Sequence, residues 1–170
     1  MADITAIFLI LVIIGIAYPA LLTAWWLLFP STVERARLRI ERTPMQSFWL
    51  GCVVLIAFLL PILILLNMPS GFLKFLGWIF IAVMLVFSSL GAAGLASRFA
   101  DRLNRLGSFS QLGAFLRGAA ILELASFFPV IGWFVFLPLA TITTLGASAF
   151  ALLRWMPKPA PAVESVPAQA

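Results

Sequence analysis

The chain contains no histidine and only one cysteine, Cys52, among its 170 residues. Without histidine, the usual zinc sites, haem ligation by imidazole and Ser-His or Cys-His nucleophile pairs are unavailable within the chain. A lone cysteine also excludes an intrachain disulfide and any CxxC metal or redox motif. We therefore expect no metal and no cofactor, and we exclude most histidine-dependent and metal-dependent enzyme classes.

Charged residues are also scarce. They make up 10% of the chain, whereas soluble domains carry ~25%, and 64% of the residues are apolar. Several apolar runs exceed the ~18 residues that a membrane-spanning helix needs. The composition therefore predicts an all-α, polytopic integral membrane protein. In such a protein the net charge of +5 is expected to mark cytoplasmic loops and lipid headgroup contacts, not nucleic-acid binding.

Proline, glycine and polar segments divide the apolar sequence into about five expected membrane helices, at residues 4–29, 45–66, 72–97, 109–128 and 132–154. Residues 1–156 are expected to form one membrane domain, followed by a disordered Pro/Ala-rich tail at residues 157–170. A variant with four crossing helices remains open, in which residues 111–128 do not fully cross the membrane and form a re-entrant hairpin with the turn that follows. Either way, Pro129 and Gly132 are predicted to lie at the hairpin apex.

A short polar segment, residues 32–42, is expected to form an amphipathic helix on the cytoplasmic membrane surface. Ser31 and Glu34 have the spacing of a capping box at its start. Its arginines share one face and its apolar residues another, which is typical of a helix that lies on headgroups. A second basic set follows the third expected span. The predicted headgroup contacts are Arg35, Arg39, Arg42, Arg98, Arg102 and Arg105.

The basic residues alternate between loops. Four lie in the loop at residues 30–47, four at residues 98–117 and two in the tail, whereas one, Lys74, lies on the opposite side. Positive residues are enriched in cytoplasmic loops, so this ten-to-one ratio predicts an N-terminus outside and a C-terminus inside. The expected location is the cytoplasmic (inner) membrane of a bacterium.

The third expected span carries small residues at every fourth position, in the rows Ser88-Ala92-Ala96 and Ser89-Ala93-Ser97. Small side chains at this spacing allow membrane helices to approach closely. We therefore expect this helix to pack tightly against a neighbour, and the protein to occur in an assembly.

Glu123 is the only charged residue in the 36 residues from 118 to 153. Ionisable residues inside a membrane are costly, so they are functional candidates by default. Ser126 and Thr141 are its expected polar neighbours. In one interpretation a protonated Glu123 stabilises helix packing by bonding the Phe134 carbonyl or the Thr141 hydroxyl. In the other, Glu123 is a proton or ion site.

Two stretches resemble a known module. "LLFPSTVERARLRIERTPMQSFWLGCVVLIAFLLP" and "FLRGAAILELASFFPVIGWFVFLPLATITTLGASAFALLR" are similar to the multi-span membrane module beside bactofilin-type polymer-forming domains in bacteria. They cover about half of the chain. The β-helical repeat of those polymer-forming domains is missing here, so polymer formation is not implied. The resemblance implies a bacterial membrane scaffold or anchor without catalytic residues.

Together these features predict a non-enzymatic accessory or scaffold subunit that packs against membrane lipids, a larger membrane protein complex or copies of itself. Its predicted partners include no nucleic acid. The alternative is a small transporter or channel component with Glu123 as its proton or ion site. A lipid-modifying enzyme ranks third, because histidine and metal ligands are missing.

Overall fold

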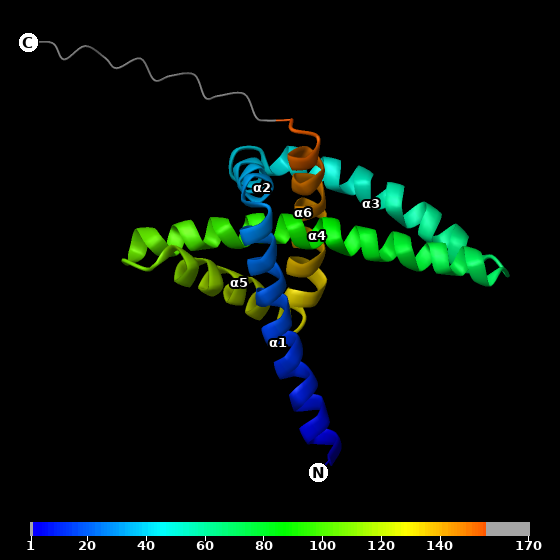
Figure 1. Cartoon of the computed structure of the whole chain (residues 1–170), viewed down its shortest axis with the longest axis horizontal. Helices are drawn as coiled ribbons and strands as arrows, with labels where there is room; N and C mark the ends of the chain where they lie inside the picture. Colours follow the sequence, from blue (N-terminus) through cyan, green and yellow to red (C-terminus); the bar gives the residue numbers. More distant parts are fainter. Residues whose placement is uncertain (1, 156–170) are drawn as a thin grey trace, which may run out of the picture.

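The computed structural model describes residues 2–155. Within the first helix, the side chains that it describes are those of residues 5, 6, 9, 10, 12, 13 and 15–28. Within residues 2–155 every regular element is helical, which confirms the all-α class. The predicted tail at residues 157–170 lies outside the described residues. The elements are α1 (Ala2–Leu28), α2 (Pro30–Arg42), α3 (Pro44–Asn67), α4 (Gly71–Leu106), α5 (Gln111–Phe127), the π-helical turn η1 (Gly132–Phe136) and α6 (Leu137–Leu152) (Figure 1).

Three helices in the described chain are long and apolar enough to cross a membrane: Pro44–Asn67, Gly71–Leu106 and the continuous segment Gly132–Leu152. A fourth is obtained if Gly15–Leu28 and α2, which are bent by 108° relative to each other, count as one broken span. These lengths agree with a membrane protein. They do not establish the expected count of five, because α5 has only 17 residues.

Proline sets the helix starts in the polar segment, but the predicted capping box is wrong. Pro30 takes the first position of α2 after Phe29, and no side chain caps this helix start. The missing N–H of proline costs nothing there, because the first N–H groups of a helix have no intrahelical partner. Helix α2 therefore begins before Ser31, which becomes a residue inside its first turn.

Helix α4 is the central element and packs against α1, α2, α3, α5 and α6. Figure 1 shows α5 lying alongside α4, whereas α1 and α6 cross it steeply, and the first half of α1 extends away from the other helices. The main buried cluster combines Leu22 of α1 and Phe115 of α5 with the small residues of α4. This arrangement confirms the predicted tight packing of the third span, since Ala92, Ala93 and Ala96 are all buried.

Helices α3 and α6 also approach at glycines. A Cβ atom on Gly51 would lie 1.8 Å from the Ile142 carbonyl oxygen, and one on Gly146 would lie 1.8 Å from the Ser47 carbonyl oxygen. Both distances are far below van der Waals contact, so any larger residue would separate the two helices.

Candidate functional site

Both predicted apex residues lie where the chain turns from α5 into η1, with Pro129 between the two elements and Gly132 as the first residue of η1. Ile131 donates its N–H to the Pro129 carbonyl, with the two atoms 2.8 Å apart, and Gly132 donates to the Phe128 carbonyl at the same distance. Val130 has a φ of 66°, a left-handed conformation that is rare for a β-branched residue. A Cβ atom on Gly132 would lie 2.5 Å from the Ala125 carbonyl oxygen, so the close return of the chain requires glycine.

The two legs of this turn do not form the expected antiparallel hairpin. Helix α5 packs against α4 and α1, meets the returning chain at η1, and then diverges from α6, which crosses α4 (Figure 1). The π-helical turn precedes Pro138, and the N–H of Leu137 donates to the Gly132 carbonyl five residues earlier. The hydrogen-bond register therefore shifts just before the proline, which has no N–H to donate.

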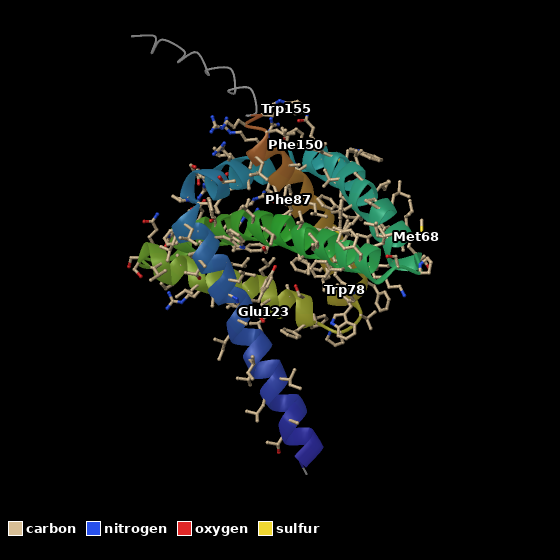
Figure 2. All side chains as sticks on the ribbon, turned by 45° about the vertical axis from the view of Figure 1, so that its right-hand side comes forward. Met68, Trp78, Phe87, Glu123, Phe150 and Trp155 are labelled. Carbon is tan, nitrogen blue, oxygen red and sulfur yellow. The ribbon has the colours of Figure 1, made fainter. Side chains whose placement is uncertain are left out.

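Glu123 points into the bundle, as predicted, with only 6% of its surface exposed. Figure 2 shows it where α1 passes α5. Its Oε1 lies 3.7 Å from the position that a Cβ atom on Gly15 would occupy. Among the described residues this oxygen has no hydrogen-bond partner. The predicted bond to the Phe134 carbonyl or the Thr141 hydroxyl is therefore wrong, because α5 places this side chain against α1 and diverges from α6.

A groove of about 560 Å³ lies beside Glu123. Residues from α1, α4, α5, η1 and α6 line it, and they bring Glu123, Ser126 and Thr141 to one site. The lining residues are Tyr18, Met84, Leu85, Ser88, Ser89, Glu123, Ser126, Phe127, Trp133, Leu137 and Thr141. Tyr18 was not recognised from the sequence, because no pattern within α1 indicates that it meets α5.

The serine hydroxyls of the groove are largely used by the fold. Ser126 donates to the Leu122 carbonyl at 2.9 Å, and Ser89 donates to the Val86 carbonyl at 2.9 Å. Ser89 also accepts the indole N–H of Trp25 at 3.0 Å, which holds α1 against α4. The Glu123 carboxyl therefore remains as an uncommitted hydrogen-bonding group of the groove.

The sequence predicted that Arg35, Arg39 and Arg42 of α2 contact lipid headgroups, but not all of these side chains are exposed. Arg39 is buried, with 6% exposure, and donates from Nε and Nη2 to the Trp155 carbonyl. Arg35 donates to the Ala151 carbonyl at 3.1 Å. The prediction is wrong for Arg39, because α2 packs against both α4 and α6 and this side chain is buried against the segment that follows α6.

The other predicted headgroup residues differ in exposure. Arg98 is half-buried and donates to the Ile40 carbonyl at 3.2 Å, which links α4 to α2. Three arginines remain exposed, as a headgroup contact requires: Arg42, Arg102 and Arg105.

Arg37 joins two helices, a role that the sequence patterns did not predict. It pairs with Glu34 and Glu41 of its own helix and with Asp101 of α4. The hydrogen bonds to Glu34 are the main reason that the pKa of the Arg37 guanidinium is raised. Partial burial opposes this rise, and the carboxylate charges of Glu34, Asp101 and Glu41 add to it. The spacing of Glu34, Arg37 and Glu41 indicates pairing within α2, whereas nothing in the sequence indicates Asp101.

No cluster of His, Cys, Asp or Glu side chains within the described residues is able to hold a metal ion. Comparison with known protein families, with curated proteins and with solved structures found no match.

Proposed function

We propose that the chain is an integral-membrane accessory or scaffold subunit that packs against lipids and a larger membrane protein complex, or against copies of itself, and has no catalytic activity of its own. Its location is the bacterial cytoplasmic membrane. We also propose that the chain is related to the membrane module of bactofilin-type proteins, because its sequence contains the two similar stretches quoted above.

The observation that carries this proposal is the uncovered apolar surface of α3. Only 11% of the most apolar window of this helix is buried within the bundle. Its exposed residues extend along most of its length: Trp49, Val53, Ile56, Leu59, Leu60, Leu63 and Ile64. A contiguous apolar surface of this kind requires lipid or another protein to cover it.

In the proposed topology five helices lie in the membrane: α1, α3, α4, α5 and the segment Gly132–Leu152. Helix α2 lies on the cytoplasmic face, and its 108° bend from α1 supports this placement. The N-terminus is outside and the C-terminus inside. A variant has four membrane helices and places α5 and its turn in a re-entrant hairpin.

A site-specific photo-crosslinking experiment in intact cells tests the subunit role. A photoreactive residue replaces Leu60, which is 56% exposed, or Ile62, which lies on the same helix and is 5% exposed. We expect the photoreactive residue at position 60 to form a discrete adduct with a second polypeptide. At the buried position 62 we expect no such adduct. Lipid adducts alone from position 60 would contradict the role as a subunit.

A second candidate function is that of a small transporter or channel component. The buried Oε1 of Glu123, which has no partner in the described chain, favours it. Proton flux into liposomes that contain the purified protein discriminates between the two functions. A scaffold gives no flux and tolerates Glu123→Gln, whereas a proton pathway gives a flux that this substitution abolishes.

A further inference from the structure

We infer that the groove beside Glu123 binds a hydrocarbon-tailed molecule whose head carries an O–H or N–H hydrogen-bond donor, and that the Glu123 carboxyl accepts this hydrogen bond. This inference goes beyond the scaffold role and does not depend on which protein covers α3.

The size and walls of the groove fit a single small amphiphile. Its volume of about 560 Å³ falls within the range of ~300–1,000 Å³ that is typical of small-molecule sites. Walls from α1, α4, α5, η1 and α6 surround it, and Met84, Leu85, Phe127 and Trp133 supply apolar surface for a hydrocarbon tail. A partner helix, with a diameter of ~10 Å, would need an open trough along one or two helices.

The head of the ligand is specified by the carboxyl group. Glu123 is 94% buried, since its exposure is 6%, and its Oε1 has no partner within residues 2–155. A buried acceptor without a partner is costly. The hydroxyls of Ser89 and Ser126 already donate to carbonyls of their own helices, so they do not satisfy it. A hydroxyl or amine on the ligand would do so.

Helix α1 packs against the Glu123 carboxyl at Gly15. The nearest heavy atom to a Cβ built on Gly15 is the Glu123 Oε1, at 3.7 Å. The α1 backbone thus approaches the carboxyl without a side chain between them. A side chain larger than that of alanine at position 15 would therefore displace the carboxyl oxygen.

Photoactivatable probes with identical sixteen-carbon tails test the proposal. One carries a primary alcohol, one a primary amine and one a methyl ether, which cannot donate a hydrogen bond. Each is added to the purified full chain in phosphatidylcholine nanodiscs, because the phosphatidylcholine head has no donor either. Peptide mass spectrometry then measures labelling at Met84, Leu85 and Phe127, with the exposed Leu60 as the reference position for bulk lipid contact.

At least one donor probe should label the groove about tenfold more than the ether, which corresponds to ~1.4 kcal/mol, whereas all three should label Leu60 equally. Glu123→Leu should remove the preference. In the Glu123→Gln variant, a retained preference for the alcohol probe over the ether probe identifies a ligand with a neutral hydroxyl head. Loss of a preference for the amine probe over the ether probe identifies a ligand with a cationic head.

Equal groove labelling by all three probes with the unaltered chain would overturn the proposal, because the groove would then hold bulk lipid. Groove labelling no higher than at Leu60, or a preference that survives Glu123→Leu in a protein with unchanged helical content, would overturn it as well. The probe comparison on the unaltered chain decides the matter even if a variant does not fold.

Discussion

Arg39 of α2 donates a hydrogen bond from Nε to the backbone carbonyl oxygen of Trp155, 2.6 Å away and 116 positions later in the chain. The same guanidinium lies 4.2 Å from the centre of the Phe150 ring. One side chain thus combines a charge-assisted hydrogen bond with a cation–π contact at the end of α6. It fixes the C-terminal end of the bundle to the polar helix α2.

The first prediction concerns this contact. Arg39→Ala should lower the stability of the folded protein by about 2 kcal/mol, because it removes a buried charged donor and leaves the Trp155 carbonyl without it. Arg42→Ala, which removes an exposed arginine three residues later, should have little effect. Thermal unfolding in one detergent measures both. An equal loss of stability in the two variants would contradict this prediction, because it would show that only the removal of a positive charge matters and not the contact with Trp155.

The crossing of α3 and α6 gives the second prediction. Gly51→Ala should destabilise the bundle by about 2–3 kcal/mol, because the new methyl group would overlap the Ile142 carbonyl and force the helices apart. Gly71→Ala is the matched control, since nothing lies within 4 Å of its Cβ position. Reversible unfolding in a mixture of mild detergent and dodecyl sulfate measures the difference. A stability of Gly51→Ala similar to that of the control would contradict the close approach.

Topology is the subject of the third prediction. Cysteines at positions 38 and 104, each in a Cys52→Ser background, should react with a membrane-impermeant thiol reagent from the same, cytoplasmic side. The ion pair between Arg37 of α2 and Asp101 of α4 supports this, because these two residues lie close in sequence to positions 38 and 104 and hold the two helix segments together. Labelling of intact cells should fail at both positions, and labelling of inverted vesicles should succeed. Reaction from opposite sides is incompatible with the proposed arrangement.

Much of the helix layout follows from local signals. Pro44 takes the first position of α3, and Gly107 follows the last residue of α4, as the sequence indicates, whereas Pro30 opens α2 before the predicted start at Ser31. Such residues act through their own backbone, so their effect is visible without knowledge of the fold. The turn at Pro129 and Gly132 is predictable for the same reason.

The errors concern contacts between distant segments. The arrangement of arginines around α2 treats the helix as having one solvent face, but α4 and α6 both pack on it, and Arg39 is buried as a result. Likewise, the presumed hairpin places the Glu123 carboxyl beside Phe134 and Thr141, whereas in the structure α5 diverges from α6 and this carboxyl lies against Gly15. Neither contact leaves a periodic signal in the sequence.

The central claim is that this chain works as part of a membrane assembly. Native mass spectrometry of the full chain, released from its own membrane by a mild detergent, tests it most directly. We predict a species that contains at least a second polypeptide, either another copy or a different subunit, and that persists as the detergent concentration is raised to twice the minimum for solubilisation. A single chain with bound lipid alone, at every detergent and lipid level tested, would contradict the account.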